Sequence, residues 1–287
     1  MQRSTIIIIL GQTVTGKSEL AVQIAKKING EIISADSRQV YKGLDIGTGK
    51  VTKKEMHGIP HYLLDVANPK EKFTVVKYQE KAISAITDIC KRNKTPIICG
   101  GTGFYIDAIT KGVIFPEVPP NTKLRKELYS KSAITLFEYL EKLDKRRARD
   151  IEIKNEQNNK VRLVRAIEIA TYLGEVPKIK TAKPNYKFIK IGLYLPEEKL
   201  RSKIEKRVGK MFKMGLLNEI KKLKKSGISN KRLREFGFEY DNPTKEKVIA
   251  ETLKYAKRQM TWFKRDKEIK WFDASRKIDT KQISKVL

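Results

Sequence analysis

Gly11-Gln12-Thr13-Val14-Thr15-Gly16-Lys17-Ser18 is the stretch of this 287-residue chain that decides its fold, and it fits the pattern G-x-x-x-x-G-K-[ST]. The apolar residues 6–10 precede it as a buried strand would, and residues 19–28 carry leucine and isoleucine at helical spacing. A loop of this kind points backbone N–H groups and the positive end of a helix dipole at an anion. The stretch therefore predicts a phosphate loop, with Lys17 against the phosphates and Ser18 as a ligand of Mg²⁺.

The charge of the chain indicates an anionic partner. Lysine and arginine number 62 against 33 acidic residues, a formal net charge of +29, and about half of this excess lies in residues 201–287. Such a charge attracts a polyanion over a long distance, and nucleic acid is the usual one. A lysine-rich proteome is the alternative explanation for part of the excess.

The composition also excludes some classes of protein. Cys90 and Cys99 are too few for a disulfide framework or a cysteine-rich zinc site. No apolar run approaches the roughly 18 residues that a membrane span needs, and the N-terminal run does not form a secretory signal. We therefore expect a cytoplasmic protein without a membrane partner.

The first hundred residues alternate short apolar runs with longer amphipathic stretches. This pattern is typical of an α/β unit in which helices cover a mostly parallel sheet. We expect strands at 6–10, 31–35 and 96–99, and helices at 19–28 and about 75–92.

The sequence changes character after Lys111. Prolines between 116 and 120 mark a linker, and residues 122–174 are amphipathic with helical spacing. Strand composition returns at 188–195, and the tail after Asp273 is polar and is expected to be peripheral. We predict helices at about 197–226 and 244–265, a catalytic core of residues 1–115 and 186–287, and a helical insertion at 116–185.

Polar residues follow two of the predicted strands at the point where each strand ends. Asp36 comes directly after the second strand, and Gly100-Gly101-Thr102-Gly103 comes directly after the third. The carboxyl ends of parallel strands meet at one edge of the sheet, where ligands of open α/β sheets bind. An aspartate beside a phosphate loop can hold Mg²⁺ through water or act as a general base. A turn or a helix N-cap is the alternative explanation for the Asp-Ser pair.

Two later stretches place cations on helices. Arg162 and Arg165 share one face of the stretch 160–169, which suits phosphate contacts, although solvated arginines are equally common there. Residues 257–265 mix cations with aromatic side chains, which suits RNA on one face and core packing on the other. In the first stretch, the side chains expected to face a core are Val161, Val164, Ile167 and Ile169.

These motifs, in this order over nearly the whole chain, resemble those of the tRNA dimethylallyltransferases, which isopentenylate adenosine 37 beside the anticodon. The resemblance implies a P-loop NTPase-like α/β core with a helical insertion. It also implies transfer of a dimethylallyl group from dimethylallyl diphosphate to N6 of adenosine 37, with release of pyrophosphate. The matching segments are GQTVTGKS (11–18), DSRQVYKGLDIGTGK (36–50), GIPHYLLD (58–65), GGTGFY (100–105), VRLVRAIEI (161–169), IEKRVGKMFKMGLLNEIKKL (204–223) and KRQMTWFKR (257–265).

The resemblance implies roles for individual residues. Asp36 accepts the N6 proton, Thr13 and Arg207 stabilise charge on the leaving group, and Ser18 binds the Mg²⁺ cofactor. The implied enzyme is a monomer that holds the anticodon stem-loop of tRNA with its insertion. The implied diphosphate-binding residues are Gly11, Gln12, Thr13, Val14, Thr15, Gly16, Lys17 and Ser18. Contacts with tRNA are implied for Asp36, Ser37, Arg38, Gln39, Thr102, Arg125, Val161, Arg162, Leu163, Val164, Arg165, Arg234, Lys257, Arg258, Gln259, Thr261, Trp262 and Lys264.

Two other functions fit part of the sequence. A small-molecule or nucleotide kinase using ATP would account for residues 1–50 but not for the insertion or the basic C-terminal third. A non-catalytic, nucleotide-gated RNA-binding module would leave Asp36 and Arg207 unexplained. A GTPase is disfavoured because the chain has no N-K-x-D segment. The chain departs from the family pattern at Glu239, where the family often has a basic residue.

Overall fold

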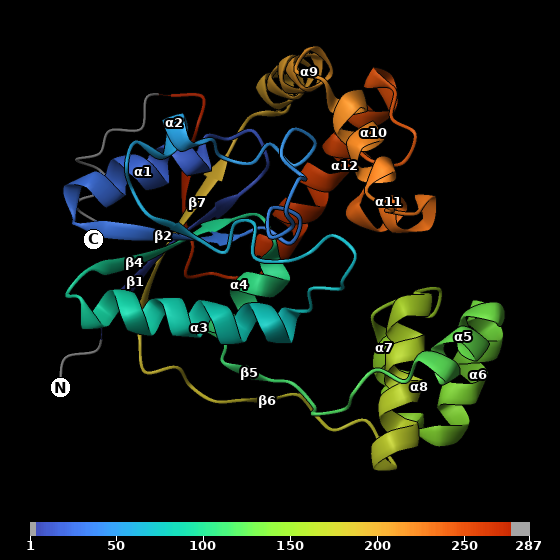
Figure 1. Ribbon diagram of the computed structural model, residues 1–287. Helices are drawn as coiled ribbons and strands as arrows, with labels where there is room; N and C mark the ends of the chain where they lie inside the picture. Colours follow the sequence, from blue (N-terminus) through green and yellow to red (C-terminus); the bar gives the residue numbers. More distant parts are fainter. Residues whose placement is uncertain (1–3, 277–287) are drawn as a thin grey trace. The chain divides into compact units, whose positions relative to one another are not determined.

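The computed structural model describes residues 4–276, which fall into two compact units (Figure 1). The first unit is made of Met1–Gly112 and Lys183–Leu287, and the second is Val113–Ala182. No helix within residues 4–276 is both long enough and apolar enough to cross a membrane.

A six-stranded, fully parallel sheet forms the centre of the first unit, in the order β3-β2-β4-β1-β7-β8. The four expected strands are confirmed. Strands β3 and β8 were not expected, because they have only two and four residues and form strands by pairing with β2 and β7 at the edges. The strands are β1 Thr5–Gly11, β2 Gly30–Ala35, β3 His61–Tyr62, β4 Thr95–Gly100, β7 Lys187–Tyr194 and β8 Lys270–Asp273.

Alternation along β1 divides the apolar core between the two faces of the sheet. Ile6, Ile8 and Leu10 pack in one cluster, and Ile7 and Ile9 pack in the other. Helix α3 (Val75–Lys91) contributes to the first cluster and α1 (Lys17–Lys27) to the second, so these helices cover opposite faces (Figure 1). All five side chains are at most 1% exposed, and burying each contributes about 1.5–3 kcal/mol before the entropy cost of ordering the chain.

The helices of the first unit begin and end at recognisable signals. Thr74 and Thr244 cap α3 and α12 by accepting backbone N–H bonds. The single helical stretch expected at 197–226 is wrong, because Gly215 adopts a φ of 96° and divides it into α9 and α10. The helices are α1 Lys17–Lys27, α2 Lys53–Met56, α3 Val75–Lys91, α4 Gly103–Thr110, α9 Glu197–Lys213, α10 Leu216–Lys225, α11 Asn230–Phe236 and α12 Lys245–Phe263.

The second unit is helical. Each of its four helices begins at a side chain that accepts a backbone N–H of the first turn, namely Asn121, Ser132, Asp144 and Asn159. A short antiparallel ribbon, β5 with β6, pairs the segments at the two ends of the unit. Its elements are β5 Val113–Ile114, α5 Thr122–Ser130, α6 Ala133–Leu143, α7 Lys145–Ile153, α8 Lys160–Leu173 and β6 Lys180–Thr181.

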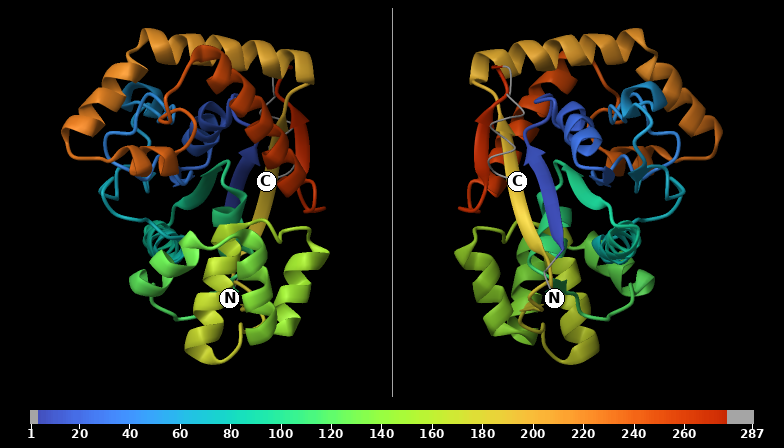
Figure 2. Two further views of the ribbon diagram at one scale, coloured as in Figure 1. Left: turned by 90° about the vertical axis from the view of Figure 1, so that its right-hand side faces the viewer. Right: turned by 90° about the vertical axis from the view of Figure 1, so that its left-hand side faces the viewer.

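Parallel pairing brings the functional segments of the first unit to one edge of its sheet. Strands β1, β2 and β4 run in the same direction, and each ends at one of the polar segments singled out in the sequence. The views of Figure 2 show β7 beside β1 and β8 beside β7 at this sheet.

Candidate active site

The loop between β1 and α1 has the backbone shape of an anion-binding nest. Gly11, Val14 and Gly16 all have positive φ, at 131°, 59° and 85°. A Cβ on Gly11 would lie 2.1 Å from the carbonyl oxygen of Leu193, so only glycine fits there. Helix α1 starts at Lys17, and the first N–H groups of a helix lack intrahelical acceptors. The loop can therefore offer several N–H donors to phosphate oxygens.

Lys17 is half-buried beside this loop, and its ammonium group donates to the carbonyl of Gln12. Burial lowers the pKa of Lys17 to about 8, the thiol of Cys99 and the carboxylate of Asp36 oppose that shift, and the guanidinium of Arg207 adds to it. A phosphate ligand would favour the charged form of Lys17.

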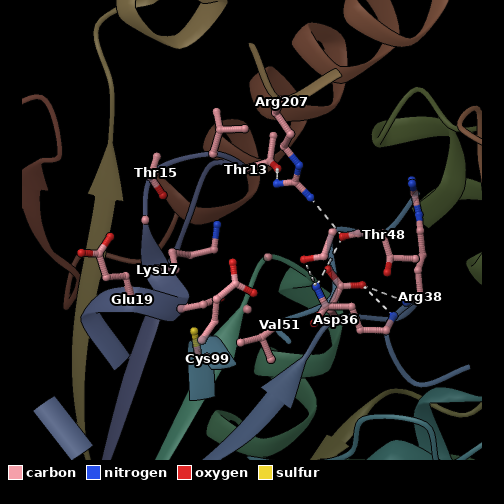
Figure 3. Close-up of a pocket in the computed structure, with 18 of the residues that line it drawn as sticks. Thr13, Thr15, Lys17, Glu19, Asp36, Arg38, Thr48, Val51, Cys99 and Arg207 are labelled. Carbon is pink, nitrogen blue, oxygen red and sulfur yellow. Dashed lines mark hydrogen bonds between the residues drawn. The ribbon is translucent and has the colours of Figure 1, made fainter. Parts of the chain in front are cut away.

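A cavity of about 540 Å³ opens over the phosphate loop, entirely within the first unit (Figure 3). Strand ends, α9 and α12 all contribute to its wall. The residues that carry the chemistry of this wall are Thr13, Lys17, Ser18, Asp36, Arg207 and Gln259.

Asp36 both shapes a turn and faces this cavity. Its Oδ1 accepts the backbone N–H groups of Arg38, at 2.9 Å, and Gln39, at 3.2 Å (Figure 3). The turn explanation from the sequence is thus correct for one carboxylate oxygen. Because the residue also lines the cavity, it is placed to act on a ligand there.

Arg207 reaches from α9 to the phosphate loop. Its guanidinium donates to Thr13 Oγ1 and to the carbonyl oxygen of Thr48, each at 3.0 Å (Figure 3). Burial lowers the pKa of Arg207, and the carboxylate of Asp36 opposes that shift. The family resemblance implied one shared role for Thr13 and Arg207, and in the structure their side chains are in contact.

Gln259, predicted to contact tRNA, also has a structural role in the site. It lines the cavity, is 6% exposed and joins two loops of the site. Its Oε1 accepts the N–H of Thr13 at 2.8 Å, and its Nε2 donates to the carbonyl of Gly101 at 3.0 Å. Gln259 therefore fixes the phosphate loop against the turn after β4. Sequence gave no sign of this, because the partners are far apart along the chain.

The remaining predicted contacts after β2 form a polar rim around Asp36. Thr102 Oγ1 accepts the backbone N–H of Ser37 at 3.0 Å. The guanidinium of Arg38 pairs with Glu239 at 2.5 Å and stacks over two aromatic rings. Glu239, at the family's usual basic position, is buried, and its charge raises the pKa of Arg38 although burial opposes this. Gln39 donates to the carbonyls of Thr48 and Gly49.

Helix α12 presents most of its predicted contacts to solvent. Trp262 is half-buried against Gly103, where a Cβ would lie 2.3 Å from the indole ring. Arg234, in the last turn of α11, is also exposed. Among the predicted contacts on and just after α12, the exposed residues are Lys257, Arg258, Thr261 and Lys264.

In the second unit, some of the residues predicted to contact tRNA are exposed, and others form ion pairs or pack in the core. Arg125 and Arg165 both pair with the carboxylate of Glu168, which is 2% exposed. Arg162 pairs with Glu156 near the surface. Leu163 and Val164, predicted to contact tRNA, are fully buried, so their side chains pack the core of this unit; Val161, also expected in the core, is 66% exposed.

Oxygen donors for a metal are present at the cavity, although they do not form a dense cluster. Ser18 and Asp36 line it together. Hydroxyl and carboxylate oxygens suit Mg²⁺, which takes few protein ligands beside phosphates and water. Within residues 4–276 no group of three or more His, Cys, Asp and Glu side chains could hold a metal by itself. The donor set fits a metal shared with a phosphorylated ligand.

A buried carboxylate that the sequence patterns did not reveal holds the segment that precedes Thr48 and Gly49 in the cavity wall. Glu219 of α10 is 8% exposed and accepts hydrogen bonds from the segment 45–47. It lies in the matching segment 204–223, but a glutamate in an amphipathic helix carries no signal of burial. The fold alone reveals its partners.

A phosphate loop, an aspartate at a strand end and an arginine that contacts the loop all line one cavity, as in a P-loop-like enzyme. The family model described as IPP transferase matches residues 39–266. The tRNA dimethylallyltransferase of Halothermothrix orenii is 40% identical, over 95% of this chain and 88% of that protein. That of Anoxybacillus flavithermus is 39% identical, over 93% and 90%. This chain belongs to the IPP transferase family.

Solved structures agree with this assignment. The tRNA isopentenylpyrophosphate transferase of Bacillus halodurans has a TM-score of 0.71 and 34% identity, over 99% of this chain and 95% of that chain. A eukaryotic dimethylallyltransferase captured acting on tRNA has a TM-score of 0.76 and 27% identity, over 97% and 75%. The predicted fold class, a P-loop-like α/β core with a helical insertion, is confirmed.

The pKa of Lys17 predicts how anion binding depends on pH. Affinity for inorganic pyrophosphate should fall by up to about tenfold per pH unit above pH 8, because the free protein then loses the Lys17 proton that the complex needs. Isothermal titration calorimetry between pH 7 and 9.5 measures this. Lys17→Ala is the control: it should bind weakly and lose this part of the pH dependence. The same slope in both proteins would contradict the assignment.

Gln259→Ala should weaken pyrophosphate binding about tenfold, because the loop loses the acceptor of the Thr13 N–H. The salt dependence of tRNA binding should stay as in the unaltered protein. Thr261→Ala, exposed on the same helix, is the matched control and should leave pyrophosphate affinity unchanged. Normal pyrophosphate affinity in Gln259→Ala, together with weaker tRNA binding at every salt concentration, would show that Gln259 acts on RNA and does not hold the loop.

Proposed function

We propose that this protein transfers a dimethylallyl group from dimethylallyl diphosphate to N6 of adenosine 37 in tRNA and releases pyrophosphate. The observation that carries this proposal is one cavity that holds a phosphate loop, Asp36 and the Thr13–Arg207 pair. The names of the similar enzymes, which act on tRNA, support the choice of acceptor.

The phosphate loop would bind the diphosphate of the donor. Its main-chain N–H groups and Lys17 recognise linked phosphates, whichever group these carry. This loop also suits a nucleotide, but an allylic diphosphate presents the same oxygens. Gly11 to Ser18 would surround them.

Asp36 would act as the general base. As N6 of adenine forms a bond to C1 of the dimethylallyl group, the bond from C1 to the diphosphate oxygen breaks and its electrons leave with pyrophosphate. The N6 proton passes to the carboxylate of Asp36. Because Oδ1 already accepts two backbone N–H groups, Oδ2 is the oxygen available for this proton.

Thr13 and Arg207 would stabilise the leaving group. Negative charge grows on the diphosphate as the bond to carbon breaks, and both side chains lie at the phosphate loop. Preorganised donors at such a position need no reorganisation during the reaction, and removing one typically costs about 2.7–4 kcal/mol in the barrier.

Ser18 would hold a Mg²⁺ ion, with Asp36 as a nearby acid that can bind through water. When bound, the ion would supply charge that balances the diphosphate. Ser18 would orient the ion at the phosphate loop, and Asp36 would orient it at the acceptor side of the cavity.

The second unit and α12 would hold the anticodon stem-loop. Adenosine 37 must leave its stack to reach a cavity, at a cost of a few kcal/mol, so further RNA contacts are needed. The exposed cations Lys257, Arg258 and Lys264 suit phosphate contacts, and Arg162 offers one on α8. We propose a monomeric, cytoplasmic enzyme in which the unit Val113–Ala182 clamps the anticodon arm.

A transfer assay tests this proposal against the kinase alternative. The protein is incubated with labelled dimethylallyl diphosphate, γ-labelled ATP and bulk tRNA. Prenyl label in tRNA is the expected result. Phosphate label in a small molecule, with none in RNA, would instead support a kinase. Association with RNA without any transfer would support a non-catalytic RNA-binding module.

Asp36→Asn should slow prenyl transfer at least about 100-fold, because the amide cannot accept the N6 proton. Pyrophosphate affinity should stay within a few-fold, since asparagine keeps the oxygen that accepts the turn N–H groups. Single-turnover transfer and calorimetry measure the two effects. Asp88→Asn, at an exposed carboxylate on α3, is the control. Unchanged transfer in Asp36→Asn would remove its role as the base.

Arg258→Ala and Lys264→Ala should each weaken binding of the anticodon stem-loop and reduce the slope of log K against log salt by about 0.7–0.9. Fluorescence anisotropy between 50 and 200 mM salt measures the slope. Lys81→Ala, exposed on α3, is the matched control and should leave it unchanged. If all three variants share the slope of the unaltered protein, these α12 cations do not contact phosphate.

A further inference from the structure

Glu219 gathers four hydrogen-bond donors around one buried carboxylate. Its Oε2 accepts the backbone N–H groups of Asp45, at 3.0 Å, and Ile46, at 2.7 Å. Its Oε1 accepts the N–H of Gly47 at 3.1 Å and the hydroxyl of Tyr240 at 2.9 Å. Three consecutive amides thus converge on a side chain from a distant helix.

The segment held in this way carries part of the active site. Directly after Gly47, the carbonyl oxygen of Thr48 accepts a hydrogen bond from the Arg207 guanidinium. Gly49 lies so close that a Cβ there would be 2.1 Å from the same guanidinium. The other terminal nitrogen of Arg207 donates to Thr13 Oγ1. The segment therefore packs against the guanidinium of Arg207 and directs it toward the phosphate loop.

The surroundings of Glu219 leave little freedom for another arrangement. A Cβ on Gly47 would lie 2.6 Å from the Tyr240 ring, so the ring and the segment pack without a gap. Burial, together with the charge of Glu219, raises the pKa of Tyr240, so its hydroxyl stays a donor. Hydrogen bonds to an ionised acceptor are about twice as strong as neutral ones.

We propose that Glu219 is a positioning residue for the transfer reaction, which acts through the segment 45–49 to hold Arg207 where charge develops on the diphosphate. The inference rests on the proposed function, because it assigns Glu219 to the same leaving-group step. A glutamine at this position would bring its own N–H₂ group toward N–H donors, so at least one donor would lose its acceptor. Arg207 would then keep its charge but lose its fixed direction.

Glu219→Gln tests this proposal. The kcat for prenyl transfer should fall by about 10- to 100-fold. The KM for tRNA should change less than kcat, because the segment is linked to Gln39 on the acceptor side by two long hydrogen bonds of 3.4 Å. Glu205→Gln, at an exposed glutamate on α9, is the matched control and should change neither constant. Tyr240→Phe removes one donor and leaves the carboxylate, so kcat should fall by only a few-fold.

A double-mutant cycle separates positioning from general support of the fold. If Glu219 acts through Arg207, Glu219→Gln should change kcat by less than about twofold in an Arg207→Ala background. Multiplicative loss in the double variant, or equal loss of kcat in Glu205→Gln, would overturn the inference. If Glu219→Gln does not fold, the same cycle is carried out with Tyr240→Phe.

The same experiments distinguish failure of this inference from failure of the proposed function. If the unaltered protein transfers no prenyl label to tRNA, the proposed function itself is refuted. Transfer by the unaltered protein, with kcat unaffected in Glu219→Gln, would refute only the positioning role.

Discussion

The contact between the end of β1 and β7 is the constraint on which the active site depends. Gly11 pairs with Leu193, and the backbone approach is too close for any side chain on Gly11. The next residue, Gln12, donates its N–H to the Leu193 carbonyl at 3.3 Å, and its side chain accepts the N–H of Leu195 at 3.1 Å. The phosphate loop is therefore attached to a strand that follows the insertion. A shift of β7 by one residue would move every one of these contacts.

The electrostatics of the cavity follow from this rigid frame. Lys17 and Arg207 are both half-buried beside the loop, and burial lowers the pKa of each. Bringing two cations so close is unfavourable, and the carboxylate of Asp36 relieves it in part. A bound diphosphate would reduce the repulsion between these cations further, because its negative charge would stabilise the charged forms of Lys17 and Arg207. Folding therefore places the cationic groups before the anion binds, so that binding needs little reorganisation.

Sequence patterns predicted the parts of the fold that depend on neighbouring residues. The isoleucine runs of β1, β2 and β4 and the phosphate loop follow from local composition, and the likeness to known structures confirms the fold class. Gly215 shows where this reasoning failed, since a single residue with positive φ divided one expected helix. The hydrogen bonds of Gln259 with the phosphate loop and of Glu219 with the segment 45–47 could not be predicted, because each joins segments more than 150 residues apart along the chain.

The basic character of the chain has two origins that sequence composition cannot separate. Some arginines are held in ion pairs of the fold: Arg125 and Arg165 share the buried carboxylate of Glu168, whose pKa their hydrogen bonds lower although burial opposes this. Breaking such a pair would leave an uncompensated buried charge, so these arginines stabilise the second unit whatever they do with RNA. Cations such as Lys264 are exposed, and their charge acts at a distance. The net charge of +29 already counts such internal pairs, so the fold is needed to locate the exposed cations that carry the excess and attract a polyanion.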